Sequence, residues 1–337
     1  MKIMSFILYN KDCLDIFPEI EDKSIDLILC DLPYGTTKCK WDCPISLDKL
    51  WEGYKRIIKT QGVVCLFGDQ PFTSILICSN LEWFRYQWIW KKNKTTGYLL
   101  ANYRPMKQTE DIIIFSPSFA AAASKHKGNM TYNPQGLIKK VVVRKNSEKR
   151  IGKMLNQIHH LGENNKLLSN KEYQQEFTNY PVEILEFSIE NDTIHPTQKP
   201  ISLCEYLIKT YSNENDLVLD NCMGSGTTGI ACIKTNRNFI GVEMEKEYFD
   251  LAEKRIIIEQ FRKISNNENW KLEDKSYKEY TAKCFRNGDF LFGRFLDNIK
   301  TEWFVLFYKE EEIKLDKKTN GEWYEKYDDI CVHQPRK

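Results

Sequence analysis

The chain has 337 residues, of which 42% are hydrophobic and 28% are charged. This apolar content is enough for a sizeable core, so the composition excludes a disordered chain and indicates two domains or one enlarged domain. Lys and Arg (49) nearly balance Asp and Glu (47), which leaves a formal net charge of +2. A polyanionic partner would therefore have to be held by a local basic patch.

Cysteine usage and hydropathy narrow the expected environment. The eleven cysteines include no C-x-x-C pair and follow no secretory leader, which favours reduced thiols in the cytoplasm over a disulfide framework. Cys39 and Cys43 have the wrong spacing for a zinc ribbon, so no metal is expected. No apolar stretch approaches the ~20 residues that a membrane span needs, so no membrane partner is expected.

Residues 1–116 alternate strand-like and helix-like runs. Short apolar runs typical of strands lie at 4–9, 25–30, 62–67, 84–92 and 111–116, and runs typical of helices lie at 46–58 and 70–81. This alternation predicts an α/β fold with a mostly parallel sheet and helices on its faces.

Residues 117–194 break this alternation and predict an insertion of loops and a few strands. Asn, Gln and Lys dominate there, and the apolar runs at 137–143 and 182–187 are isolated. Between Lys125 and Lys153 the insertion has nine Lys or Arg residues and one acid, Glu148. Such a stretch is either a solvated loop or a surface for a polyanion.

The α/β alternation returns over residues 195–263. Helix-like runs lie at 202–212, 227–236 and 245–261, and strand-like runs lie at 216–220 and 239–244. The sheet is therefore predicted to be built from two separated halves of the chain.

Residues 264–337 form a third kind of segment. A polar linker is followed by strand-like runs at 302–308 and 322–330, and Asn320-Gly321 is a strong hairpin signal. We predict a small β-containing appendage, to which the sequence assigns no role.

Two loops carry most of the chemical information. The segment DLPYG, Asp31 to Gly35, follows the apolar run 25–30, and VLDNCMGSGTTGIAC, Val218 to Cys232, turns from a strand through glycines into a helix. In an open α/β sheet, ligands bind outside the carboxyl ends of the strands. We therefore expect the two loops to face each other across one cleft.

The glycine-rich loop has the spacing of a nucleotide-binding turn. Gly224, Gly226 and Gly229 satisfy G-x-G-x-x-G, and Glu243 ends the next strand, where a carboxylate can accept hydrogen bonds from both ribose hydroxyls. Asp220 places a negative charge where a pyrophosphate would need positive potential. A carboxylate there suits a cationic group such as the ammonium of a methionine moiety. The pattern therefore favours S-adenosylmethionine over a nicotinamide dinucleotide.

Three segments in order resemble one enzyme family. DLPYG at 31–35, HPTQKP at 195–200 and LDNCMGSGTT at 219–228 are similar to the amino-group (adenine-N6 or cytosine-N4) DNA methyltransferases whose catalytic loop precedes the cofactor loop. The resemblance covers about residues 4–262 and leaves the tail outside. It implies a seven-stranded Rossmann-like sheet, S-adenosylmethionine as cofactor, and a target-recognition region between the two halves.

The resemblance also implies which residues bind the cofactor. In similar proteins the positions of Asp12 and Cys13 hold the adenine, although Asp12 is equally well placed to cap the following helix. His195, Thr197 and Lys199 match the segment that leads a helix toward the methionine end. The cofactor-binding residues implied in this way are Asp12, Cys13, Asp31, Lys199, Asp220, Gly224, Ser225, Gly226, Thr227 and Glu243.

The chain departs from the family pattern at two positions of the glycine-rich loop. Asn221 and Cys222 stand where Pro and Phe are common. The loss of a ring could loosen the pocket, but it removes no polar contact.

The loop DLPYG supplies the expected catalytic residues Asp31, Leu32, Pro33 and Tyr34. A base amine is a poor nucleophile because its lone pair is delocalised, and acceptors for both amino protons favour a pyramidal nitrogen. The Asp31 carboxylate and the carbonyl of Leu32, where the family usually has Pro, can supply them, and Pro33 still restricts the backbone. The Tyr34 ring can stack on a base rotated out of the duplex. The acidic residues of TEDIIIF, 109–115, are weaker candidates for shaping the cleft, because core packing or helix capping explains them equally well.

The expected function is methylation of adenine N6 in double-stranded DNA, in the cytoplasm. The Asp at position 31, where Ser is commoner among cytosine-modifying relatives, favours adenine over cytosine N4. The alternatives are that cytosine reaction, modification of RNA or of a protein glutamine, and a catalytically silent DNA-binding module, against which the intact acids argue. A partner restriction endonuclease and a homodimer stay open. The candidate DNA-binding residues are Lys139, Lys140, Arg144, Lys145, Lys149 and Arg150.

Overall fold

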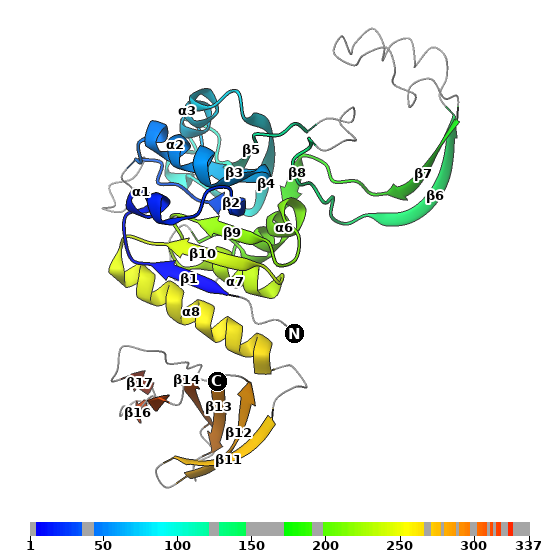
Figure 1. Cartoon of the computed structure of the whole chain (residues 1–337). Helices are drawn as coiled ribbons and strands as arrows, with labels where there is room; N and C mark the ends of the chain where they lie inside the picture. Colours follow the sequence, from blue (N-terminus) through cyan, green and yellow to red (C-terminus); the bar gives the residue numbers. More distant parts are fainter. Residues whose placement is uncertain are drawn as a thin grey trace.

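A central eight-stranded sheet organises the molecule (Figure 1). The computed structural model describes residues 5–35, 44–120, 128–145, 172–190 and 198–265, together with short strands between 271 and 325. In spatial order, the strands of the sheet are β1 (Phe6–Tyr9), β10 (Asn238–Val242), β9 (Leu217–Asp220), β2 (Ile25–Cys30), β3 (Ile58–Gly68), β5 (Lys107–Phe115), β4 (Phe84–Thr96) and β8 (Ile184–Glu186).

The sheet joins the two halves of the chain at its centre. Strands β1, β10, β9, β2 and β3 are parallel, and β9 pairs with β2 through Val218 opposite Leu27. Strand β5 runs antiparallel to both β3 and β4. The α/β class with a mostly parallel sheet, predicted from the sequence, is confirmed. Because β2 and β9 are neighbours, the loops that follow them leave the same edge of the sheet.

Helices cover both faces, because alternate residues of each strand point to opposite sides. Leu27 and Leu29 of β2 face one core layer, and Ile28 and Cys30 face the other. The first layer lies under α6 (Ile201–Tyr211), α7 (Thr227–Lys234) and α8 (Lys246–Ser265). The second lies under α1 (Cys13–Ile16), the short helix η1 (Phe17–Glu19), α2 (Leu47–Ile57) and α3 (Phe72–Ser79).

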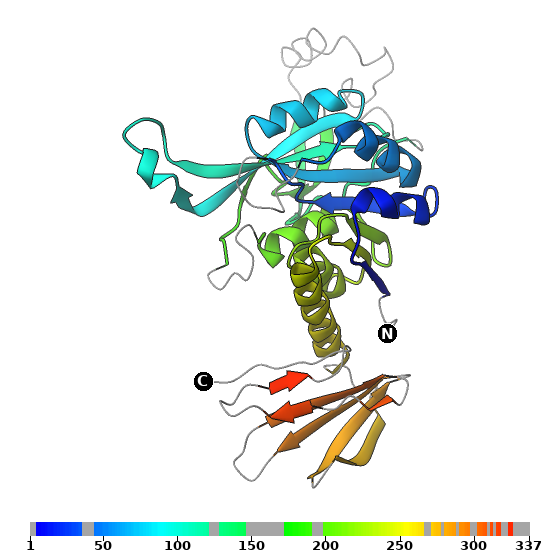
Figure 2. The same ribbon diagram turned by 90° about the vertical axis from the view of Figure 1, so that its left-hand side faces the viewer.

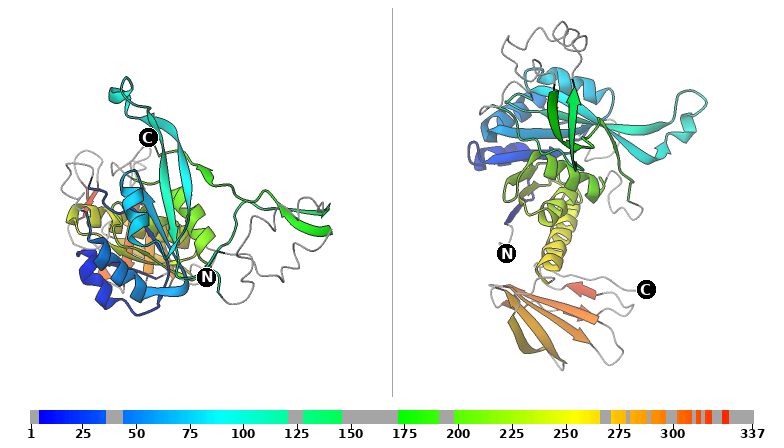
Figure 3. Two further views of the ribbon diagram at one scale, coloured as in Figure 1. Left: turned by 90° about the horizontal axis from the view of Figure 1, so that it is seen from above. Right: turned by 90° about the vertical axis from the view of Figure 1, so that its right-hand side faces the viewer.

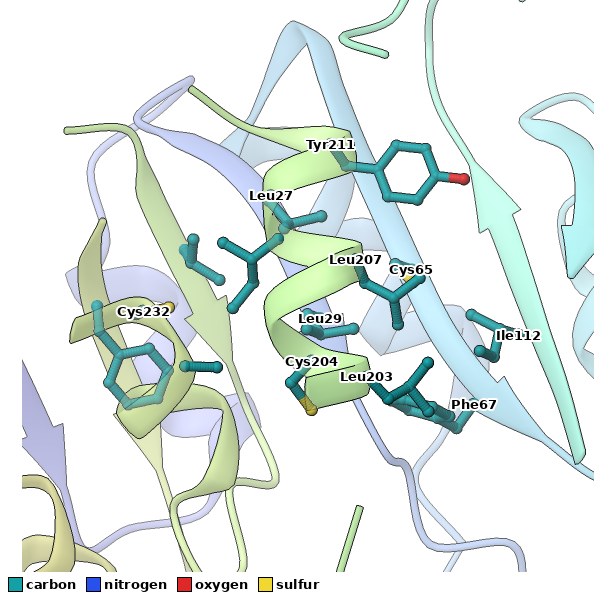
Figure 4. Packing of buried hydrophobic residues seen from close by; sticks show 14 of the residues in the cluster. Leu27, Leu29, Cys65, Phe67, Ile112, Leu203, Cys204, Leu207, Tyr211 and Cys232 are labelled. Carbon is teal, nitrogen blue, oxygen red and sulfur yellow. The ribbon is translucent and has the colours of Figure 1, made fainter. Parts of the chain in front are cut away.

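Helix α6 shows how this packing is achieved (Figure 4). Leu203, Leu207 and Tyr211, spaced by four residues, lie on one face of the helix and are fully buried. They face the side chains of Leu29 and Cys65 from β2 and β3. This packing fixes the start of α6, and with it the segment that carries Lys199.

Two hairpins leave the body of the protein. Strands β4 and β5 extend past the sheet and are joined through the short helix η2 (Tyr98–Leu100) (Figure 2). Strands β6 (Ile138–Lys145) and β7 (Glu172–Thr178) form a separate antiparallel pair that projects away from the sheet (Figure 3).

The run 182–187, expected to be an isolated element of the insertion, instead contributes an edge strand to the main sheet. Strand β8 pairs in parallel with β4, with Leu185 opposite Trp90. The described sheet therefore has eight strands rather than the seven that the resemblance implies.

The described part of the C-terminal segment contains β-strands, as expected of a β-containing appendage. A five-stranded antiparallel sheet contains β11 (Lys271–Tyr277), β12 (Tyr280–Asn287), β13 (Phe290–Leu296), β14 (Glu302–Tyr308) and β15 (Glu311–Glu312). Strands β16 (Leu315–Lys317) and β17 (Trp323–Glu325) pair antiparallel on either side of the predicted Asn-Gly turn, which itself lies outside the described residues. Among the described residues, no helix is long and apolar enough to cross a membrane.

Candidate active site

A cavity of about 660 Å³ opens at the carboxyl ends of β2, β9 and β10. The loop after β2 and the glycine-rich loop after β9 both line it, so the structure brings Tyr34 and Gly224 to one site. The predicted residues that line it are Asp12, Cys13, Asp31, Leu32, Pro33, Tyr34, Lys199, Asp220, Gly224, Ser225, Thr227 and Glu243. His195 and Thr197 lie outside the described residues.

Two glycines give the loop after β9 its shape. Gly224 and Gly226 have φ values of 49° and 76°, a region that side chains other than glycine rarely adopt. A Cβ on Gly226 would lie 2.9 Å from the Cβ of Ala252 on α8, so this glycine allows the loop to pack on that helix. A Cβ on Gly224 would meet nothing within 4 Å. At that position the backbone faces open space, where a ligand can approach it.

Asp220 is a buried carboxylate at the bottom of the cavity. It is only 4% exposed, and its two oxygens accept hydrogen bonds from the Thr228 hydroxyl (2.6 Å) and the Cys222 amide (3.1 Å). Burial raises the pKa of this carboxyl to about 7, against the lowering effect of these two donors. A cationic group in the cavity would stabilise the ionised form. The site therefore fits a ligand with an ammonium group.

Glu243 is oriented by the glycine-rich loop itself. Its carboxylate accepts hydrogen bonds from the amides of Gly224 and Glu245, each at 2.9 Å. Burial raises the pKa of Glu243. Because a carboxylate has about four acceptor positions, two backbone bonds still leave capacity for ribose hydroxyls.

Asp12 and Cys13 lie where the first helix begins. Asp12 caps α1, since its Oδ1 accepts a hydrogen bond from the Leu14 amide at 2.8 Å, and it also lines the cavity. Asp12 therefore has the helix-capping role that the sequence allowed, and it is also part of the cavity wall. Cys13 is buried, and a hydrogen bond with Cys222 together with burial raises the pKa of its thiol.

The unusual Asn221 has a polar partner that the sequence did not reveal. Its Oδ1 accepts a hydrogen bond from the hydroxyl of Tyr54 at 2.6 Å, and both side chains are buried. Tyr54 lies on α2, so this contact ties the glycine-rich loop to the layer of helices on the other half of the chain.

The loop after β2 is held by an ion pair. The Nζ atom of Lys199 lies 2.6 Å from Oδ2 of Asp31, and the hydroxyl of Tyr34 donates to Oδ1 of Asp31 at 2.8 Å. The Tyr34 ring also stacks on Phe72, with centroids 4.9 Å apart. Burial raises the pKa of Asp31, although Lys199 and Tyr34 act in the opposite direction.

A second carboxylate, Glu110 of β5, completes this cluster. It is 7% exposed, its Oε1 lies 2.8 Å from Nζ of Lys199, and its Oε2 lies 2.7 Å from Nζ of Lys92 on β4. Burial disfavours its charge, but Lys199 and Lys92 hold the pKa of Glu110 well below its usual range. The two carboxylates raise the pKa of Lys199 despite its burial. The sequence pattern assigns Glu110 no firm role and does not distinguish Lys92 from its neighbours on the strand.

Four of the basic residues of the insertion belong to strand β6. Lys139 and Lys140 are exposed on β6, and Arg144 and Lys145 end the same strand. Neither Lys139 nor Lys140 lines the cavity. Lys149 and Arg150 lie outside the described residues.

Comparisons with known proteins agree with this geometry. A family model described as DNA methylase matches residues 25–254. The Type II methyltransferase M.HpaI of Haemophilus parainfluenzae is 27% identical over 93% of this chain and 97% of its own length. The DNA adenine methyltransferase YhdJ of Escherichia coli (strain K12) is 25% identical over 80% and 90%, respectively.

A solved structure shares the fold. The PvuII DNA methyltransferase (cytosine-N4-specific) is 15% identical and covers 78% of this chain and 94% of its own, with a TM-score of 0.51. The match to M.HpaI covers 93% of this chain, which is more than the resemblance over residues 4–262 accounts for. The similarity to M.HpaI therefore extends into the C-terminal segment.

Proposed function

The chain belongs to the DNA methylase family, and from this premise we propose that it transfers a methyl group to the N6 amino group of adenine in double-stranded DNA. The observation that carries the proposal is the single cavity shared by the loop with Asp31 and the glycine-rich loop. Its cofactor is S-adenosylmethionine, which supplies an electrophilic methyl group when bound. The similarity to an adenine methyltransferase supports the choice of base.

The residues around Asp220 are suited to hold the cofactor. Asp220 would pair with the ammonium of the methionine moiety, and Glu243 would accept hydrogen bonds from the ribose hydroxyls. Gly224 leaves room for the backbone to approach the ligand. Asp12 and Cys13, at the start of α1, would face the adenine ring.

Asp31 and its loop would prepare the target amine. The carboxylate of Asp31 would accept a hydrogen bond from one amino proton, and the carbonyl of Leu32 would accept from the other. Together they localise the lone pair on nitrogen and orient it toward the methyl group, so most of the acceleration comes from alignment and preorganised acceptors. The base would leave the duplex to reach this cavity, and the Tyr34 ring, which lines the cavity, would stack on it.

The β6–β7 hairpin would hold the DNA backbone. Lys139 and Lys140 are exposed on this projecting element, and Arg144 and Lys145 follow on the same strand. Contacts with phosphates supply affinity that depends on salt but not on sequence.

We also propose a partner restriction endonuclease, a homodimer and a cytoplasmic location with the DNA. Sedimentation of the protein alone and with DNA tests the dimer.

The experiment that tests the proposed function uses radiolabelled S-adenosylmethionine. Short duplexes that differ in base content are incubated with the protein, and the products are digested to nucleosides and separated. Label in N6-methyladenine supports the proposal. Label in N4-methylcytosine, or only in RNA, overturns the choice of substrate, and no label in any nucleic acid favours a silent binding module.

A further inference from the structure

The hydroxyl of Tyr34 has two acceptors and only one proton. Its oxygen lies 2.8 Å from Oδ1 of Asp31 and 3.1 Å from Oε1 of Glu110. Burial, together with these two carboxylates, raises the pKa of Tyr34, so the hydroxyl keeps its proton. Because a hydroxyl donates one hydrogen bond at a time in good geometry, the proton can point to either carboxylate.

The ammonium of Lys199 is shared in the same way. It lies 2.6 Å from Oδ2 of Asp31 and 2.8 Å from Oε1 of Glu110. The two donors that occupy Asp31 therefore both reach a single oxygen of Glu110. The other oxygen of Glu110 is held by Lys92 at 2.7 Å, which fixes the orientation of the carboxylate.

This arrangement bears on how Asp31 can accept a hydrogen bond from the target amine. In the structure each oxygen of Asp31 already accepts one hydrogen bond and keeps one further acceptor position, but the target amine must share the carboxylate with two bound donors, which weaken it as an acceptor. We propose that Glu110 is a positioning residue that takes over the Tyr34 hydroxyl, and shares Lys199, when Asp31 turns an oxygen to the amine of the target base. This inference rests on the proposed function and assigns Glu110 no contact with the base.

The electrostatics of the cluster support this role. The negative charge of Glu110 raises the pKa of Asp31, which makes the Asp31 carboxylate a stronger acceptor. The groups that act on Asp31 come from several elements: Tyr34 from its own loop, Lys199 from the segment before α6, Glu110 from β5, Asp220 from β9, Cys30 from β2 and Cys204 from α6. Of these, Glu110 alone is a carboxylate that shares both of the donors bound to Asp31.

Glu110→Gln tests the proposal. The amide has one oxygen for two ammonium groups, so its NH₂ group would face either Lys92 or Lys199, and the neutral oxygen is a weaker acceptor for Tyr34 and Lys199 than the carboxylate. We expect kcat to fall about 100-fold, as for a misplaced reacting group. Affinity for S-adenosylmethionine, measured by calorimetry, should be unchanged. Fluorescence of 2-aminopurine at the target position should still rise on binding, because the base still leaves the duplex.

The pH profile separates a positioning role from a merely structural one. The acid limb of kcat reports the ionisation of Asp31 in the complex. In Glu110→Gln this limb should move to lower pH, since the charge that raised the pKa of Asp31 is gone. Lys92→Gln removes a compensating cation instead, so the limb should move to higher pH. Lys92 is partly exposed, so this second variant tests the same cluster if Glu110→Gln fails to fold.

Glu186→Gln is the matched control, because it removes a carboxylate that pairs with an exposed lysine, Lys91, on the same strand as Lys92. It should leave kcat and its pH profile unchanged. An unchanged kcat in Glu110→Gln, a loss that is due to weaker cofactor binding, or limbs that do not move in opposite directions would each overturn the role of Glu110. Failure of the wild-type protein to methylate DNA would instead reject the proposed function.

Discussion

The Nζ atom of Lys199 lies 2.6 Å from Oδ2 of Asp31, although 168 residues separate the two in the chain. Lys199 lies two residues before α6, after the insertion, and Asp31 directly follows β2, before the insertion. The pair thus joins the two halves of the chain at the cavity.

Lys199→Met should destabilise the protein strongly. It leaves the buried carboxylate of Glu110 and the partly buried carboxylate of Asp31, which is 24% exposed, without their shared cation; breaking a buried pair costs about 3–5 kcal/mol. The loss should be smaller at pH 5 than at pH 8, because protonation relieves the two carboxylates. Urea unfolding at both pH values measures the change.

Lys91→Met provides the comparison for this measurement. Lys91 pairs with Glu186 on the surface, where both side chains are well exposed, and such pairs contribute about 0–1 kcal/mol. Equal losses in Lys91→Met and Lys199→Met would contradict the importance of the buried cluster.

Asp31→Asn should lower kcat by about 10²–10³-fold, because the amide is a weaker acceptor for the amino proton than the carboxylate. Affinity for S-adenosylmethionine should stay close to that of the wild type, since Asp220 and Glu243 are untouched. Single-turnover methylation and calorimetry measure the two quantities. Asp31→Ala should abolish turnover, and a fully active Ala variant would remove Asp31 from the mechanism.

Binding of S-adenosylmethionine should strengthen between pH 6 and pH 8. The pKa of Asp220 is about 7 in the folded protein, so the ionised fraction that attracts an ammonium rises about tenfold over this range. In the absence of ligand, the contribution of Asp220 to the stability of the folded protein depends on pH with the opposite sign. The folded state binds the proton more tightly than the unfolded state, so the stability of the free protein falls as pH rises from about 4 to about 7.

Asp220→Asn should lose this contribution to the pH dependence of cofactor binding, because the amide does not titrate. Calorimetric titrations of wild type and variant across the range make the comparison. A wild-type affinity that weakens as pH rises would show that Asp220 does not face a cation.

Charge reversal at Lys139 and Lys140 should weaken DNA binding and reduce its salt dependence. Each lost phosphate contact lowers the slope of log K against log salt by about one. Fluorescence anisotropy with a labelled duplex at several salt concentrations measures both effects. Reversal of two exposed lysines elsewhere, Lys49 on α2 and Lys254 on α8, should change binding much less. If reversal of Lys49 and Lys254 weakened DNA binding as much as reversal of Lys139 and Lys140, the β6–β7 hairpin would be an ordinary solvated element and not a DNA contact.

The parts of the molecule that local pattern determines could be predicted from the sequence. The run 25–30 and the glycine spacing marked two strand ends, and an open parallel sheet places such ends at one edge. That is why Asp31, Asp220 and Glu243 were identified together. Each of them directly follows or ends a strand, so its position needs no knowledge of distant pairing.

The role of Glu110 depends on pairing that no local pattern shows. It reaches Lys199 only because β5 runs antiparallel to β3, and it meets Lys92 because β4 returns beside β5. The sequence signal for Glu110 was an acidic residue directly before the apolar run 111–116. Such a residue ordinarily lies at a solvent-exposed end of a strand and has no special role. The pairing of β8 with β4, and that of Asn221 with Tyr54, were hidden for the same reason.

The order of the strands has a consequence for synthesis on the ribosome. β2 leaves the exit tunnel early, yet its neighbour β9 begins only at Leu217, and β10, next to β9, ends at Val242. A nascent chain that ends within the insertion therefore has Asp31 but lacks the strands that position the glycine turn and Glu243. Methylation therefore requires β9 and β10, and a chain that ends before Leu217 lacks both strands.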